Sequence, residues 1–195
     1  MGRFIFLDQT RFDLTDLMTV LGCTLFSRIS NEQRESVALF CSDFSEIEDW
    51  TVDAHNSAHQ SDISWLNSQV ENIARHEPHC KIVVFTYHSP TMLEAANDPR
   101  QLQDWLEEGI DASEAWTQTN ITPFVTDLSD QICWTSANVR LWAFGHTHFN
   151  CDFEDPETKK RVVANQKGYR RSELETFDAS KVVKVETLLD SEAKA

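Results

Sequence analysis

Short runs of apolar, β-branched and aromatic residues divide the chain into predicted strands. Runs of this kind, bounded by polar turn residues, are typical of strands in a buried sheet. Asp155-Pro156-Glu157-Thr158 is typical of a hairpin turn between two strands. We expect strands at Phe4–Leu7, Thr19–Phe26, Lys81–Tyr87, Val139–Phe144, Arg161–Ala164 and Lys181–Val185.

Between the second and third of these strands, the apolar period changes to that of a helix. Ile63, Leu66, Val70 and Ile73 recur at three and four residues, which predicts a helix with one buried face. We expect it to begin near Ala54 and to end before Pro78, because proline breaks a helix. Strands interleaved with helices indicate an α/β fold. We expect one domain over residues 1–187, followed by a charged tail over 188–195.

The connection from Thr91 to Asn138 is long, with weak helical patches at Gln101–Glu107 and Phe124–Ile132. Loops of this length are uncommon unless they are functional, so we expect a lid or a specificity insert near a site. Within it, Arg100 is a candidate for contact with phosphate, because a guanidinium can bind two oxygens.

Composition narrows the classes of partner. The 195 residues suit one domain, and 41% of them are hydrophobic, which is ample for a core. With 32 acidic against 17 basic residues and a net charge of −15, nucleic acid is a poor partner. No basic run suggests a membrane surface, and no apolar stretch reaches the roughly 20 residues of a membrane span.

The five cysteines are odd in number, and none forms a Cys-x-x-Cys pair, which argues against a zinc ribbon or a thioredoxin-type motif. We expect reduced thiols and, because the sequence shows no signal peptide, a cytoplasmic protein.

Three histidines follow predicted strands. His146 and His148 come directly after Val139–Phe144, and alternate side chains of an extended chain face the same way. His88 comes after the strand that begins at Lys81, and Pro90 then ends that strand. Ligands of open α/β sheets collect at the carboxyl ends of strands, and three imidazoles there suit zinc, iron or manganese.

The remaining histidines have simpler interpretations. His55 and His59 stand four residues apart on the predicted helix, where they could clasp a metal ion, but we interpret them as part of an exposed polar face. Asp53-Ala54-His55 is interpreted as the start of that helix and not as a pair of ligands. His76 and His79 flank Pro78, and we expect both to be solvated.

These motifs resemble the calcineurin-like metallophosphoesterase family. The most specific is Gly145-His146-Thr147-His148, preceded by Tyr87-His88-Ser89-Pro90, and the likeness covers about Gly2 to Val185. Further segments are similar to the later part of the family's domain: Leu21–Ser27, Asp49–Thr51, Asp62–Leu66 and Val163–Tyr169.

The resemblance implies a layered β-sandwich flanked by helices, two divalent metal ions (manganese, iron or zinc) and hydrolysis of a phosphorylated substrate. It assigns His88 and His146 to one ion and His148 to the other. Tyr87 stands where many relatives carry a further histidine. Asn165, within a matching segment, is a second candidate for substrate contact beside Arg100.

The carboxylate half of the family's site is missing from this sequence. The first half of the domain supplies Asp-x-His, Gly-Asp and Gly-Asn-His, but none of the five glycines here is followed by Asp or Asn. We therefore expect an incomplete sandwich, truncated before its first strands, with exposed sheet edges that favour self-association or pairing.

Three functions follow from this gap. The first is a truncated phosphoesterase, from which we do not expect hydrolysis by this chain alone. The second is a non-catalytic binding or regulatory module that pairs with an intact relative. The third is a mononuclear hydrolase that uses His88, His146 and His148, with an open position for water.

Overall fold

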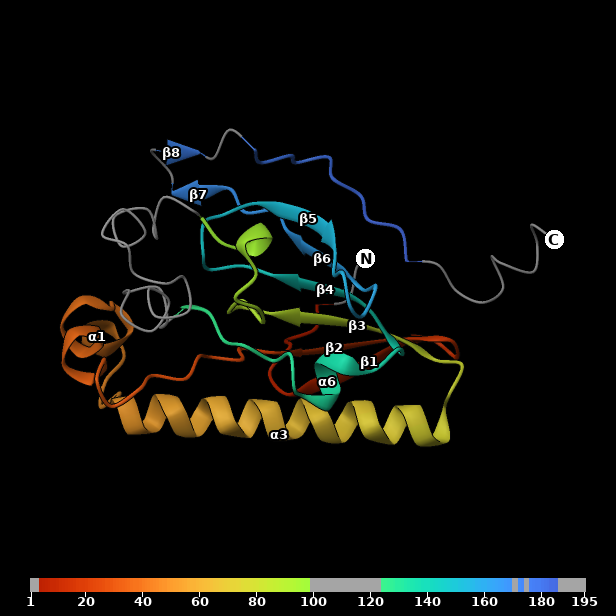
Figure 1. The fold of residues 1–195 in the computed structure, drawn as a ribbon, viewed down its shortest axis with the longest axis horizontal. Helices are drawn as coiled ribbons and strands as arrows, with labels where there is room; N and C mark the ends of the chain where they lie inside the picture. Colours follow the sequence, from red (N-terminus) through yellow and green to blue (C-terminus); the bar gives the residue numbers. More distant parts are fainter. Residues whose placement is uncertain (1–3, 99–123, 170–171, 174–175, 186–195) are drawn as a thin grey trace.

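The computed structural model describes residues 4–98, 124–169, 172–173 and 176–185. Its centre is a six-stranded sheet in the order β1-β2-β3-β4-β6-β5 (Figure 1). Strands β2, β3, β4 and β6 are parallel, whereas β1 and β5 pair antiparallel at the two edges. The bounds are β1 Thr10–Thr15, β2 Met18–Cys23, β3 Lys81–Thr86, β4 Val139–Phe144, β5 Cys151–Glu154 and β6 Arg161–Ala164. A separate two-stranded sheet joins β7, Gly168–Tyr169, to β8, Ser172–Glu173.

The long helix α3, Val52–His76, runs along one face of the sheet (Figure 1). It begins two residues before the expected start because the Thr51 side chain accepts the backbone N–H of Ala54, at 3.1 Å, as an N-cap. The predicted stripe of apolar residues is buried as expected. The shorter helices are α1 Arg34–Phe40, α2 Asp43–Glu46, the 3-10 helix η1 Glu94–Ala96 and α6 Ile132–Thr135.

The helical patch expected at Phe124–Ile132 is wrong, since α6, the only described α-helix in this part of the chain, begins at Ile132. The backbone N–H of Thr126 donates to Ser89, and that of Leu128 donates to Pro90, which draws this segment alongside the loop after β3. The patch expected at Gln101–Glu107 lies outside the described residues, and so does the boundary expected at 187–188.

The two faces of the sheet are covered differently. Toward α3, the alternate residues of β2, β3 and β4 join the helix stripe in the main core, which also contains Trp134 and Trp142. On the other face, a smaller cluster centres on Val20, Val83 and Leu141 and is covered by parts of the segments 4–9 and 181–185. Parallel strands need cover on both faces, and here extended segments supply part of it on the second face.

Two predicted strands, Phe4–Leu7 and Lys181–Val185, are wrong. Leu7 packs so closely on Gly22 that a Cβ added there would lie 2.7 Å from the Leu7 Cβ. Val183 and Val185 also contact the second face of the sheet. Leu7, Val183 and Val185 therefore pack on the sheet without strand pairing.

The α/β class is confirmed by the mixed sheet and its long helix. The hairpin turn at Asp155–Thr158 is also confirmed, because it joins β5 to β6. The second β-layer of a sandwich is not found in the part of the chain that the structure describes. None of the described helices is both long and apolar enough to cross a membrane.

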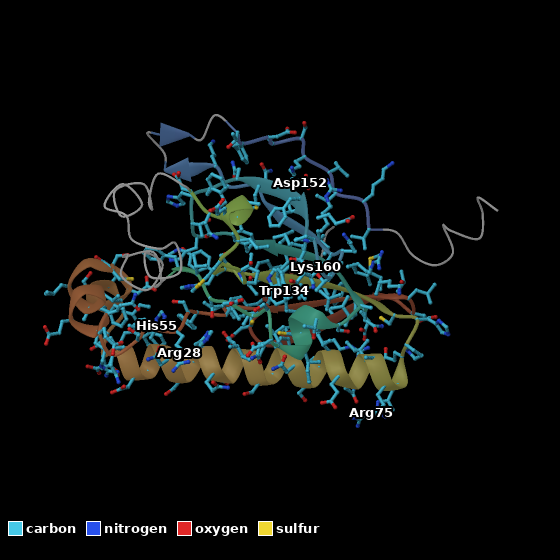
Figure 2. All side chains as sticks on the ribbon, viewed as in Figure 1. Arg28, His55, Arg75, Trp134, Asp152 and Lys160 are labelled. Atoms are coloured by element: carbon cyan, nitrogen blue, oxygen red, sulfur yellow. The ribbon has the colours of Figure 1, made fainter. Side chains whose placement is uncertain are left out.

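A buried lysine lies beside the β5–β6 hairpin. The Lys160 side chain is 1% exposed, and its ammonium donates hydrogen bonds to the Trp134 carbonyl and to Thr158 Oγ1. Nζ also lies 4.4 Å from the centroid of the Trp134 ring. Figure 2 labels Lys160 and Trp134 near the middle of the molecule. Desolvation by burial lowers the pKa of Lys160 to about 8.

Candidate metal centre

His88 and His146 are brought together at the carboxyl edge of the parallel strands. Each follows its strand, β3 or β4, by two residues, and their ring centroids lie 4.6 Å apart. The two loops are tied to each other, because the backbone N–H of Gly145 donates to the Tyr87 carbonyl at 3.1 Å. The backbone N–H of His88 donates to Thr24, which follows β2. Neighbouring strand ends therefore deliver both imidazoles to one place, as the sequence predicted.

His148 lies in the same loop, two residues after His146. Its charge helps to lower the pKa of His146, so the two side chains interact electrostatically. Among the described residues, no three or more His, Cys, Asp or Glu side chains gather closely enough to hold a metal ion. The structure thus assembles a pair of imidazoles, with the third nearby.

The backbone around these strand ends is strained. His146 and His148 have φ values of 67° and 51°, and Leu25 and Phe26, after β2, have 72° and 42°. Non-glycine residues in this left-handed region are unfavourable by about 1–3 kcal/mol each and cluster at functional sites. Here four of them lie after two of the parallel strands, next to the paired imidazoles.

A further histidine that we interpreted as exposed belongs to this region. His55 is 0% exposed, and its ring centroid lies 6.0 Å from that of His88 and 5.0 Å from that of Phe26. Its Nε2 accepts a hydrogen bond from the backbone N–H of Ser27 at 3.3 Å. The interpretation of His55 and His59 as an exposed polar face is therefore wrong.

The reason is that the first turns of α3 pack against the loop after β2. His59 Nδ1 lies 2.9 Å from the Leu25 carbonyl oxygen, and Asp62 accepts the backbone N–H of Leu25 at 2.7 Å. The sequence carried a signal for this burial, since His55 and His59 precede Ile63 at intervals of four residues, which continue the helical spacing of the apolar stripe. His76 and His79, in contrast, are exposed as expected.

Burial controls the charge of these imidazoles. Desolvation lowers the pKa of both His55 and His146 to about 4, and it also lowers the pKa of His59. All three rings are therefore neutral at pH 7. A neutral imidazole with an available lone pair is the form that binds a metal ion.

The residues present fit part of a metal centre. His146 Nε2 is buried without a hydrogen-bond partner among the described residues, which suits a ligand atom. Two of the described carboxylates are committed elsewhere: Asp62 to Leu25 and Gln9, and Asp53 to Arg34 at 2.8 Å on the exposed side of α3. The charge of Asp43 acts on His55. Neutral imidazoles alone do not neutralise two dications.

Gln166, which we did not single out, holds the loop that carries His146 and His148. Its Oε1 accepts the backbone N–H of His148 at 2.9 Å, and its Nε2 donates to Thr147 Oγ1 and to the Phe149 carbonyl. Asn150 and Gln166 also exchange hydrogen bonds between side chain and backbone. The segment after β6 therefore fixes the conformation of the loop after β4.

The other predicted contacts are placed as follows. Both ends of the Asn165 amide bind the main chain of Asp178, at 2.8 and 3.0 Å. Arg100 lies outside the described residues. The Tyr87 ring, half exposed, lies 4.4 Å from the His146 ring. The five cysteines are free thiols.

A scan against protein-family models, a search of curated proteins and a search of solved structures each gave no match.

Proposed function

We propose that this chain carries the histidine half of a two-metal centre that hydrolyses phosphoesters. In this proposal His88 and His146 bind one divalent ion and His148 binds the other, with manganese, iron or zinc as the candidates. The observation that carries it is the 4.6 Å separation of the His88 and His146 rings at adjacent strand ends.

The roles of the residues follow from their geometry. When bound, divalent metal ions polarise a phosphoryl oxygen and activate a water nucleophile. His146 supplies a neutral ring with a buried nitrogen that has no partner among the described residues, so a metal ion would replace no existing hydrogen bond there. Gln166 holds His148 through its backbone.

The carboxylate half must come from outside the motifs found here, so we do not expect turnover by this chain alone. In a two-layer sandwich, a second sheet would lie on the face of Val20, Val83 and Leu141, together with the segments that already cover these residues. Phe85 points to the same side and is 42% exposed, which supports a further layer on that face.

A second candidate function is a non-catalytic binding or regulatory module derived from the same fold. The observation that favours it is the exposure of three phenylalanine side chains, Phe4, Phe6 and Phe85, which are available for contact with a partner. Co-purification of the chain with an intact relative would support this candidate.

Bound metal per chain, measured by plasma mass spectrometry, tests the proposed function. We expect close to one equivalent or more in the wild type and at least about a tenfold loss of affinity in His146→Ala and in His148→Ala. His76→Ala, on the exposed face of α3, is the matched control and retains its metal. A wild type without metal, or His146→Ala that keeps it, contradicts the proposal. Metal-dependent turnover of an aryl phosphate would instead favour a self-sufficient mononuclear centre.

A further inference from the structure

Two buried N–H groups near the start of α3 have no acceptor among the described residues: Nδ1 of His55 and Nε1 of Trp50. The two rings lie edge to face, with centroids 6.1 Å apart. Buried donors in native proteins are almost always paired, so two orphaned donors in adjacent rings call for an explanation. An acceptor atom bound between or beside them would satisfy both.

The hydrogen bond from Ser27 fixes which nitrogen of His55 carries the proton. A backbone amide can only donate, so the contact from Ser27 N to His55 Nε2, at 3.3 Å, requires a lone pair on Nε2. In the neutral ring the proton is therefore on Nδ1. His55 presents an N–H group and not a lone pair, which suits an oxygen acceptor and does not suit a metal ion.

The position of His55 at the start of α3 favours a negatively charged acceptor, whereas the charge of Asp43, which also acts on the ring, opposes one. The residue lies in the first turn of the 25-residue helix α3, where the aligned peptide dipoles leave partial positive charge. Phe26, Phe44 and Trp50 enclose the ring, and a hydrogen bond in such dry surroundings is stronger than one in water. Figure 2 places His55 at the opposite end of α3 from Arg75.

The same rings connect this donor pair to the histidine pair. His55 lies 6.0 Å from His88, and His88 lies 4.6 Å from His146, measured between ring centroids. Phe44 and Trp50 also line an open cavity of about 400 Å³, whose lining includes the N-cap residue Thr51 and one charged residue of each sign, Arg34 and Glu35. The donors therefore lie between the candidate metal centre and an open cavity.

We infer that His55 and Trp50 bind a phosphoryl oxygen of the substrate, through Nδ1–H and Nε1–H, beside the centre formed by His88 and His146. This inference rests on the proposed function and names the side of the site that receives the oxyanion. His55 acts as a substrate-binding donor whose proton position is set by Ser27.

Nitrogen-15 NMR of the histidine-labelled full chain tests the inference, with inorganic phosphate as the probe and with or without Zn²⁺. We expect the His55 resonances to report a neutral ring protonated on Nδ1, and the attached proton to shift when phosphate is added. A ring protonated on Nε2, or resonances that phosphate does not move, would overturn the inference. This measurement needs no variant.

Phosphate affinity of variants, measured by calorimetry in the presence of Zn²⁺, provides the second arm. His55→Phe keeps an aromatic ring but removes the donor. We expect the dissociation constant for phosphate to rise about tenfold, with the amount of bound zinc unchanged. Trp50→Phe is expected to weaken phosphate binding by a few fold. His55→Gln, which keeps an N–H donor, should bind phosphate more tightly than His55→Phe. His76→Phe is the control and should bind phosphate as the wild type does. If His55→Phe fails to fold, His55→Gln and the NMR arm still decide.

The outcomes separate the two proposals. Bound zinc with phosphate affinity unchanged in His55→Phe overturns the inference and leaves the proposed function standing. Loss of zinc in His55→Phe also overturns it, because His55 would then support the metal and not the oxyanion. Absence of zinc from the wild type contradicts the proposed function. If phosphate then moves the His55 resonances without metal, the donor assignment stands alone; if it does not, both fall.

Discussion

The side-chain carbonyl of Gln166 accepts the backbone N–H of His148, with 2.9 Å between Oε1 and N. This bond connects the loop after β6 to the loop after β4. The residue that donates it, His148, has a left-handed backbone, with φ of 51°. The amide therefore helps to stabilise a conformation that the chain would otherwise leave.

Gln166→Ala is expected to weaken metal binding by about tenfold, since the loss of a residue that orients ligands typically reduces affinity by about 10–100-fold. Isothermal calorimetry of a titration with the metal ion measures this change in affinity. Gln60→Ala, on the exposed side of α3, is the matched control. Unchanged affinity in Gln166→Ala would show that the loop keeps its conformation without the hydrogen bonds of the Gln166 side chain.

Acid should destabilise the metal-free protein through its buried histidines. The unfolded state takes up protons near the ordinary pKa of 6.5, whereas burial holds the pKa of His55 and His146 at about 4 in the folded state. Between these values the unfolded state binds more protons, so stability is lost as pH falls from 6.5 toward 4.

Urea denaturation at several pH values checks this dependence. Each such ring contributes a slope of up to about 1.4 kcal/mol per pH unit. His55→Phe should therefore show a shallower fall than the wild type, while His76→Phe keeps the wild-type slope. Equal slopes for all three proteins would contradict the assignment of His55 as a buried neutral ring.

The core beneath α3 should be sensitive to loss of volume. Leu66 is fully buried in the main cluster, so Leu66→Ala is expected to lower the free energy of unfolding by about 2–5 kcal/mol. Leu39→Ala removes the same atoms from an exposed position on α1 and should change it by less than about 0.5 kcal/mol. Chemical denaturation compares them directly; similar losses would mean that α3 does not pack on the sheet as described.

Asp62 should stabilise the exit of β2. Its carboxylate accepts the backbone N–H of Leu25 at 2.7 Å and the Gln9 amide at 2.9 Å. Asp62→Ala leaves that buried N–H without a partner and should destabilise the fold by about 2 kcal/mol. Asp62→Asn keeps an oxygen that can accept from Leu25, so its loss should be smaller. A lower melting temperature for Asp62→Asn than for Asp62→Ala would argue against this role.

Sequence alone predicted two strands to the residue, since Val139–Phe144 and Arg161–Ala164 match β4 and β6 in the interior of the sheet. The interior strands β2 and β3 were predicted with inexact bounds, because the apolar runs of Thr19–Phe26 and Lys81–Tyr87 continue past the strand ends into the loops. Strand β1, Thr10–Thr15, was missed because an edge strand mixes polar and apolar residues. Phe4–Leu7 was mistaken for a strand because apolar character predicts burial and not a hydrogen-bonded neighbour.

The candidate site divides in the same way. The pairing of His88 with His146 was predictable, because carboxyl ends of parallel strands meet at one edge. The burial of His55 was missed, although its spacing from Ile63 fits the buried face of α3, because imidazole was counted as a polar residue. Gln166 was missed because most of its contacts are with backbone groups, which do not depend on the type of the residue contacted.

The burial of Lys160 makes the rate of its chemical labelling a measure of local opening. Burial holds the pKa of Lys160 at about 8 while the hairpin is closed, and in that state the Trp134 ring and the hairpin keep reagents away from the amine. Its acylation would then proceed only as fast as the hairpin opens. The rate at which one peptide acquires label would report the local opening of the sheet edge at β5, without any engineered probe.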